Sequence, residues 1–154
     1  MGEKTKMRRM DVVELVNGLR AASRLTAPPM MDNRKFAYAV SRNLVFLVPI
    51  VEQAAKLETA FEEERLALNK IHGKKDDKGQ YIMTRGSDGI DHYTLVDEAA
   101  FNGAYKPLKK EFDDDMAADV DVEIHKVAFA DIPPGITGDQ MHAIRWLVKD
   151  PPQE

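Results

Sequence analysis

A long segment of helical periodicity, from Asn33 to His72, is the feature that most constrains how this chain can fold. Apolar side chains recur in it every seven residues, and such a row occupies one side of an α-helix. Pro49 lies inside the segment and removes one backbone donor, so we expect a kinked helix or two helices joined there. The main row is Val40, Leu47, Ala54, Phe61 and Leu68, and a second row of Ala37, Leu44 and Val51 continues into Leu57 and Ile71.

Two other segments have the pattern needed to cover these rows. Asp11 and Glu14 have the spacing of a capping box, which predicts a first helix that folds back on the first half of the long segment and ends at the proline pair 28–29. Asp97 predicts the N-cap of a later helix that covers the second half. We therefore expect an antiparallel helical hairpin and not a coiled-coil dimer. The apolar face of the first helix is Val12, Leu15, Val16, Leu19 and Ala22, and that of the later helix is Phe101, Tyr105, Leu108, Phe112 and Met116.

Two regions have β patterning. Gln80–Arg85 and Ile90–Leu95 flank a four-residue loop, Gly86–Gly89, and predict a hairpin. Because an isolated hairpin is marginal in water, it must pack on the helices, pair with a later strand or become ordered on a partner. Val120–His125 alternates strictly between apolar and polar residues, which predicts a strand with one buried face.

The end of the chain predicts one more helix, which begins with a capping box of Thr137 and Gln140 and ends at Pro151. We therefore expect a mostly helical α+β fold: a long helical hairpin with a small β-hairpin and strand element and a C-terminal helix. With 154 residues, one domain is expected. Its parts are a basic flexible arm (1–9), a helical region (10–72), a hairpin insertion (73–97), a helix (98–118) and a strand followed by the C-terminal helix (119–150). The last helix is expected to bury Met141, Ile144, Leu147 and Val148.

Composition excludes several classes of protein. The chain has no cysteine, which excludes disulfides, thiolate metal sites and cysteine nucleophiles. The basic start precedes an amphipathic helix instead of an apolar signal segment, and the most apolar window, Leu44–Val51, is too short to cross a bilayer. Residues 1–35 carry eight Lys or Arg against four acids, whereas Glu111–Glu123 carries seven acids and no base. We expect these two poles either to pair within the fold or to be solvated surface.

Asp121, Glu123 and His125 alternate on the predicted strand and therefore point to one side of it. Two carboxylates and an imidazole could hold a divalent cation such as Mg²⁺ or Mn²⁺. The polar outer face of an amphipathic strand explains the same pattern without a metal. We therefore assign no cofactor and no catalytic residue, and keep a metal-dependent nucleic-acid enzyme as a third alternative.

Other chemical motifs are weak. Asp91 and His92 are neighbours on a strand and so face opposite sides, and the sequence contains no phosphate loop and no HExxH motif. The basic cluster Lys4, Lys6, Arg8 and Arg9 lacks the interleaved aromatic residues that stack on bases, so nucleic acid is not an expected partner.

A protein-binding role suits the remaining features, which are an acidic stretch, a charged helical rod and an exposed hairpin. Acidic surfaces compete for basic sites on other proteins, and a projecting hairpin can add to a partner's sheet. The residues expected to bind a partner are Tyr81, Met83, Arg85, Asp88, His92, Tyr93, Asp113, Asp114 and Asp115.

Three segments, Met10–Leu19, Lys35–Leu44 and Val120–Val127, together resemble a family of small uncharacterised bacteriophage proteins. The glutamate-rich middle and the closing segment Ile136–Ile144 extend the resemblance over most of the chain. The resemblance implies a viral source and expression in the cytoplasm of a bacterial host, and it carries over no activity. We therefore expect a non-enzymatic accessory protein that binds a host transcription or defence factor. The alternative is a virion or assembly component, and the oligomeric state stays open.

Overall fold

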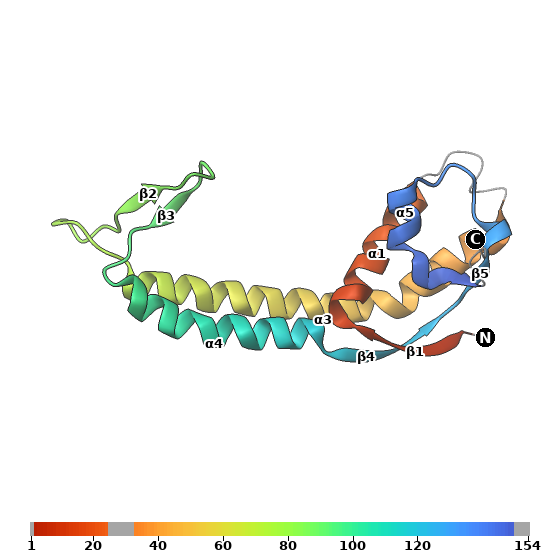
Figure 1. The fold of residues 1–154 in the computed structure, drawn as a ribbon, viewed down its shortest axis with the longest axis horizontal. Coiled ribbons are helices and arrows are strands. Elements are labelled where there is room, and N and C mark those ends of the chain that lie inside the picture. The colour runs from red at the N-terminus through yellow and green to blue at the C-terminus, as the bar shows by residue number, and fades with distance from the viewer. Residues whose placement is uncertain (1, 25–32, 150–154) are drawn as a thin grey trace. The chain divides into compact units, whose positions relative to one another are not determined.

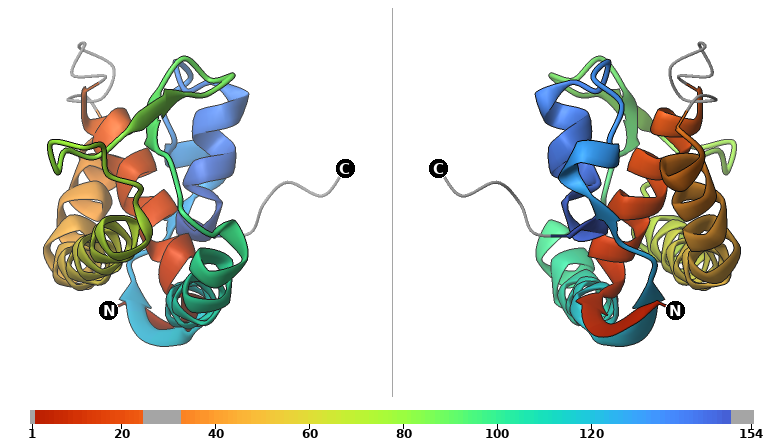
Figure 2. Two further views of the ribbon diagram at one scale, coloured as in Figure 1. Left: turned by 90° about the vertical axis from the view of Figure 1, so that its left-hand side faces the viewer. Right: turned by 90° about the vertical axis from the view of Figure 1, so that its right-hand side faces the viewer.

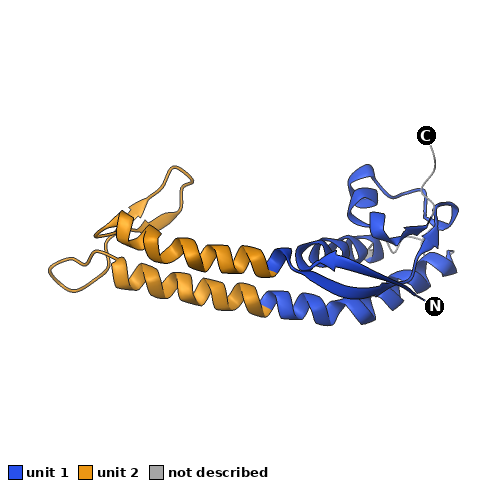
Figure 3. Ribbon diagram, turned by 60° about the horizontal axis from the view of Figure 1, so that its bottom comes forward, with its two compact units in different colours: residues 1–55, 116–154 blue, residues 56–115 orange. Residues whose placement is uncertain are grey.

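The computed structural model describes residues 2–24 and 33–149 and has the predicted α+β architecture (Figure 1). Its contacts divide the chain into two compact units, residues 1–55 with 116–154 (unit 1) and residues 56–115 (unit 2), where one domain was expected (Figure 3). The elements in chain order are β1 (Glu3–Arg8), α1 (Arg9–Arg24), α3 (Arg34–His72), β2 (Met83–Arg85), β3 (Asp91–Tyr93), α4 (Glu98–Ala117), β4 (Asp119–Ile124), β5 (Val127–Ala128), η1 (Phe129–Asp131), α5 (Gly138–Ala143), η2 (Arg145–Leu147) and β6 (Val148–Lys149).

Unit 1 contains an antiparallel sheet of β1 and β4. The residues expected to form a flexible basic arm are strand β1 instead, so that prediction is wrong. The strand forms because basic residues of β1 lie opposite acids of β4, Lys4 opposite Glu123 and Lys6 opposite Asp121, while Met7 is buried on the inner face. Part of each charged pole, Lys4 and Lys6 of the basic one and Asp121 and Glu123 of the acidic one, therefore lies on the same sheet.

Helix α1 begins at Arg9, ahead of the predicted N-cap residue Asp11. Asp11 lies inside its first turn and accepts two hydrogen bonds from the Arg8 guanidinium, at 2.9 and 3.2 Å. The predicted capping box is therefore wrong, and the hydrogen bond from Arg8 to Asp11 raises the pKa of the guanidinium. The predicted apolar face is confirmed, since all five of its side chains are fully buried. The proline pair 28–29 lies outside the described residues.

Helix α3 starts as predicted, because the Phe36 N–H donates to Asn33 Oδ1 at 3.0 Å. It continues through Pro49 without a break. The carbonyl that loses its donor belongs to Val45, whose side chain is exposed, so water can satisfy this carbonyl. The part of α3 in unit 1 buries its predicted main row at Val40, Leu47 and Ala54.

Helix α5 has the predicted capping box: the Gln140 N–H donates to Thr137 Oγ1 (3.3 Å) and the Thr137 N–H donates to Gln140 Oε1 (2.9 Å). The helix ends at Ala143, before a 3₁₀ turn and strand β6, so the predicted longer helix is wrong; Pro151 lies outside the described residues. Val148 pairs with Val127 of β5 in parallel. Helices α1 and α5 lie side by side (Figure 2). They are so close that a Cβ added to Gly18 would lie only 2.8 Å from the Cβ of Ala143. The core of unit 1 is Met7, Val12, Leu15, Val16, Leu19, Ala22, Phe36, Ala39, Val40, Leu47, Val122, Ile124, Val127, Ile144 and Leu147.

Unit 2 contains the predicted antiparallel helical hairpin, made of the end of α3 and most of α4. Asp97 caps α4, accepting from the Ala100 N–H at 3.1 Å. The ring of Phe61 stacks on that of Phe112 at 4.5 Å between centroids, which confirms that the aromatic face of α4 covers α3 here. Among residues 56–115, Phe61 at 9% exposure is the only buried apolar side chain.

The predicted β-hairpin is also present, with shorter strands: β2 and β3 pair antiparallel, Thr84 opposite His92. Two loops have the same construction: 76–80, which precedes the hairpin, and 86–90, which connects its strands. In the first loop, the Asp76 N–H donates to the Gln80 carbonyl (2.8 Å) and the Gly79 N–H donates to the Asp76 carbonyl (3.0 Å). In the second loop, the Gly86 N–H donates to the Ile90 carbonyl (2.9 Å) and the Gly89 N–H donates to the Gly86 carbonyl (3.0 Å). The fourth residue is glycine in both loops, Gly79 (φ 76°) and Gly89 (φ 77°), because other side chains are strained at this positive φ.

Candidate functional site

A groove of about 530 Å³ lies in unit 2 between strand β3 and the helical hairpin. Its sides come from three segments that are separate in sequence, and it combines aromatic, aliphatic and polar side chains, as binding sites commonly do. The lining residues are Arg65, Leu66, Asn69, Ile90, Asp91, His92, Tyr93, Leu95, Phe101 and Tyr105.

The helical side of the groove is fixed by contacts within the helices. Glu62 accepts two bonds from the Arg65 guanidinium, at 2.7 and 3.0 Å, and the hydrogen bond raises the pKa of Arg65. Asn69 donates from Nδ2 to the Arg65 carbonyl at 3.1 Å. On α4, the rings of Phe101 and Tyr105 stack at 5.6 Å. The wall is therefore largely preformed, which lowers the entropy lost when a ligand binds.

The β side of the groove offers a strand edge. In an antiparallel pair, residues alternate between those that bond the partner strand and those that direct their backbone groups away from it. The Gly86 N–H bonds the Ile90 carbonyl (2.9 Å), and the Thr94 N–H bonds the Ile82 carbonyl (2.9 Å), which places the pair of Thr84 and His92 in the bonded class. Asp91 and Tyr93 therefore direct their N–H and C=O groups away from β2.

The hairpin is fixed to the end of α3. Three backbone bonds link three segments: Lys74 N–H to Thr94 O (2.7 Å), Thr94 N–H to Ile82 O (2.9 Å) and Ile82 N–H to Lys74 O (2.8 Å). The Tyr81 hydroxyl donates to the Lys70 carbonyl at 3.0 Å, and its ring contacts that of Tyr93 edge-on at 5.3 Å. Of the three ways in which the hairpin could be ordered, the structure thus has it packed on the helices.

The outer loop of the hairpin contains an Asp–His pair. Asp88 Oδ1 accepts from the Ile90 N–H at 2.9 Å, and His92 Nε2 lies 2.9 Å from Asp88 Oδ2. The backbone bond, followed by the bond to His92, lowers the pKa of Asp88. His92 therefore pairs with Asp88, four residues away in the sequence, and not with its neighbour Asp91. The arrangement closes the loop.

The structure brings together some of the residues predicted to bind a partner. His92 and Tyr93 line the groove. Tyr81 does not line it, but its ring packs edge-on against that of Tyr93. Met83 and Arg85 are exposed on β2, while Asp88 holds the loop. The acidic run lies outside the groove. Asp113 and Asp114 pair with Lys109 (2.9 Å) and Lys110 (2.7 Å), and Asp115 lines a separate hollow beside Phe61 and Phe112.

Sequence reasoning missed the helical wall of the groove. The one available signal was the spacing of Arg65 and Asn69, which are one helical turn apart and so share a face. Phe101 and Tyr105 were assigned to the contact with α3, and they also reach the groove.

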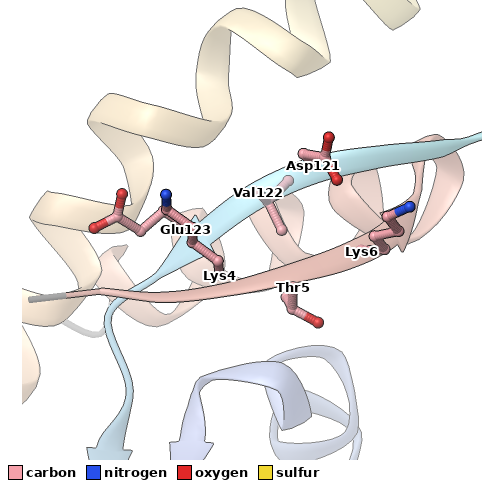
Figure 4. A pocket seen from close by; sticks show the side chains of 6 residues that line it. All are labelled: Lys4, Thr5, Lys6, Asp121, Val122 and Glu123. Carbon is pink, nitrogen blue, oxygen red and sulfur yellow. The ribbon is translucent and has the colours of Figure 1, made fainter.

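The three candidate metal ligands do not meet. Asp121 and Glu123 share the outer face of the β1–β4 sheet with Lys4 and Lys6, as Figure 4 shows, and a shallow hollow of about 500 Å³ lies there. His125 follows the strand. Its N–H donates to Asn43 Oδ1 at 2.8 Å, and Asn43 Nδ2 donates to its carbonyl at 2.9 Å. No group of three or more His, Cys, Asp or Glu side chains among residues 2–24 and 33–149 could hold a metal ion. The structure therefore does not bring the weak candidate ligands Asp121, Glu123 and His125 together as a site.

Within the described ranges, no helix combines the length and apolarity needed to span a membrane. Comparisons with family models, with curated proteins and with solved structures give no match for this chain.

Proposed function

We propose that this chain is a non-enzymatic accessory protein of phage type that acts by binding another protein in the groove beside β3. The observation that supports the proposal is that a strand edge and a preformed aromatic wall line the same groove. A strand edge supplies backbone hydrogen bonds to an added peptide, and pockets beside it select the peptide's side chains.

The chemistry of the groove suggests the form of the partner segment. An extended segment can pair with the outward groups of Asp91 and Tyr93 and place alternate side chains against Phe101 and Tyr105. Ile90, at 61% exposure, stands at the rim, and Leu66 is exposed on the helical side. Exposed apolar side chains at the rim of a groove are typical of protein interaction sites. The segment we propose is therefore extended, with apolar residues at alternate positions.

The resemblance to phage proteins supplies the proposed setting, which is the cytoplasm of a bacterial host. There the partner we propose is a host transcription or defence factor. A phage virion or assembly protein is the alternative, and the same experiment tells the two apart by the identity of the partner.

A photo-crosslinking amino acid placed at Leu66 tests the proposal in infected host cells. We expect a discrete crosslinked product from Leu66 and none from the exposed Thr59, which is on the same helix outside the groove. Ile90→Asp should reduce the product at least about fivefold, the effect of roughly 1 kcal/mol at an interface residue.

The matched control for this variant is Ile71→Asp, since Ile71 is also a largely exposed isoleucine of unit 2 (72%) and does not line the groove. It should leave the crosslinked product unchanged. Circular dichroism of both variants verifies that unit 2 stays folded. No product above the Thr59 level, or equal loss with both variants, would refute the groove as the binding site.

A further inference from the structure

A row of alternating cationic and aromatic side chains follows one face of α3 in unit 1. Arg34, Tyr38, Arg42 and Phe46 are spaced four residues apart, so each is a neighbour of the next on the helix surface. All four are exposed, Tyr38 at 62% and Phe46 at 42%. The Arg42 guanidinium lies 4.6 Å from the centroid of the Phe46 ring, so the cation and the ring already contact each other.

His125 adds a third ring to this row. Its ring lies 6.2 Å from that of Tyr38, edge-on, and 6.4 Å from that of Phe46, nearly parallel. The buried amide of Asn43 holds the His125 backbone by accepting from its N–H and donating to its carbonyl. These two hydrogen bonds fix the position of the His125 backbone and so limit the position of its ring. The rings of Tyr38, Phe46 and His125, together with Arg42, form a preorganised surface, here called the α3 platform.

The part of α3 that carries the platform has a positive charge that no acid of the described residues pairs with. From Arg34 to Val51 the sequence has three cations, Arg34, Lys35 and Arg42, and no acid. None of the three cations forms an ion pair with a carboxylate of residues 2–24 or 33–149. The cations of β1 differ, because Lys4 and Lys6 stand opposite acids of β4.

The platform continues into a hollow of about 490 Å³ at the start of α3. Arg34 and Lys35 line it together with Asn33 and the segment 130–134. Asp131 is the acid in this lining, and the Asn33 amide donates to its backbone carbonyl. Two cations against one carboxylate leave the hollow positive, so it favours a phosphate.

We propose that the α3 platform binds single-stranded nucleic acid. Base faces stack on exposed rings and on guanidinium planes, while phosphates pair with the Arg and Lys side chains. Tyr38 and Phe46 are eight residues apart, which is about 12 Å along a helix and matches three to four stacked nucleotides at about 3.4 Å each. An acidic peptide would satisfy the charge and leave the ring faces unused.

This proposal departs from the expectation that nucleic acid is not a partner. That expectation considered the cluster of Lys4, Lys6, Arg8 and Arg9, which lacks aromatic residues. In the fold, Lys4 and Lys6 stand opposite acids of β4, and Arg8 pairs with Asp11. The α3 row combines the two residue types, and it is independent of the groove in unit 2.

Fluorescence anisotropy of the full chain with labelled oligonucleotides of about fifteen nucleotides tests the proposal. We expect binding to oligo-dT or oligo-rU at about 50 mM salt that weakens strongly at about 200 mM. The two homopolymers separate a DNA ligand from an RNA ligand. Tyr38→Ala should weaken binding about tenfold, and Tyr38→Phe should retain it because the ring remains.

Arg42→Glu should also weaken binding about tenfold or more, whereas Lys56→Glu should change it little. Lys56 is the matched control, since it is an exposed cation on the same helix outside the platform. Three results would overturn the proposal: no binding at low salt, equal loss with both charge variants, or equal affinity for duplex DNA or poly-glutamate. Ile90→Asp should leave oligonucleotide binding unchanged, so failure of the groove proposal is distinguishable from failure of this one.

Discussion

Unit 1 and unit 2 are held together by different interactions. Unit 1 buries a contiguous apolar core between its helices and the β1–β4 sheet, and many of its side chains are fully inaccessible. Unit 2 has Phe61 as its one buried apolar side chain, and no residue of α4 is buried. Its order comes from stacked rings, backbone bonds and two glycine loops. We conclude that unit 1 carries most of the stability of the chain, while unit 2 leaves more of its apolar and polar groups exposed.

Truncating the core of unit 1 should have the largest effect. Phe36→Ala should lower the free energy of unfolding by about 3–5 kcal/mol, because it removes a fully buried ring and leaves a cavity. Guanidinium denaturation measures the change. Tyr38→Ala, an exposed aromatic on the same helix, should change stability by less than about 0.5 kcal/mol. Similar losses for the two variants would contradict the core described for unit 1.

Truncating the stack of unit 2 should have a smaller and local effect. Phe61→Ala removes the ring contacts with Phe112 and Tyr105 and should cost about 2–3 kcal/mol, below a fully enclosed phenylalanine. Hydrogen exchange read by mass spectrometry should show faster exchange over residues 56–115 and unchanged protection in α1. Equal acceleration in both units would show that their stabilities are not separable.

The loop glycines should matter less again. Gly89→Ala should destabilise the hairpin by about 1–2 kcal/mol, since alanine is strained at this positive φ. Gly103→Ala, in α4 where a Cβ meets no atom, should instead stabilise by about 0.5–1 kcal/mol. Thermal unfolding of both variants provides the comparison. A neutral or stabilising Gly89→Ala would mean that the loop does not need its left-handed residue.

The smallest expected effect is a pH dependence confined to the same loop. The pKa of Asp88 is lowered from 3.8, so ionised Asp88 stabilises the loop above that value. This stabilisation is lost as the pH falls through the lower pKa of the folded state. Amide chemical shifts of Ile90, followed from about pH 6 to about pH 2, should report the loss. Asp88→Asn should abolish that titration, and a change centred above 3.8 would contradict the assigned cause.

Elements with local signals could be predicted from the sequence. Asn33, Asp97 and Thr137 each cap a helix, as their residue types indicate. The alternation of apolar and polar residues predicted strand β4. Strand β1 could not be predicted, because Met7 is its only buried side chain and its partner lies far along the chain.

The candidate site was predictable only in part, for a related reason. The hairpin residues His92 and Tyr93 have a local β pattern, whereas Arg65, Asn69 and Phe101 reach the groove only after α3 and α4 have packed. Spacing within one helix cannot show which face a second segment will cover. Pro49 illustrates the same limit, since the local rule allowed either one kinked helix or two helices, and the structure has one continuous helix.

The pairing of β1 with β4 has a consequence for biosynthesis. Strand β1 leaves the ribosome before α1, α3 and all of unit 2, and its partner strand is made only afterwards. Until β4 has been synthesised, the unpaired strand β1 can pair with other chains and aggregate. Charged side chains on a strand oppose such pairing. Lys4 and Lys6 therefore have two successive tasks: they keep the nascent strand apart from other chains, and they later face the acids of β4.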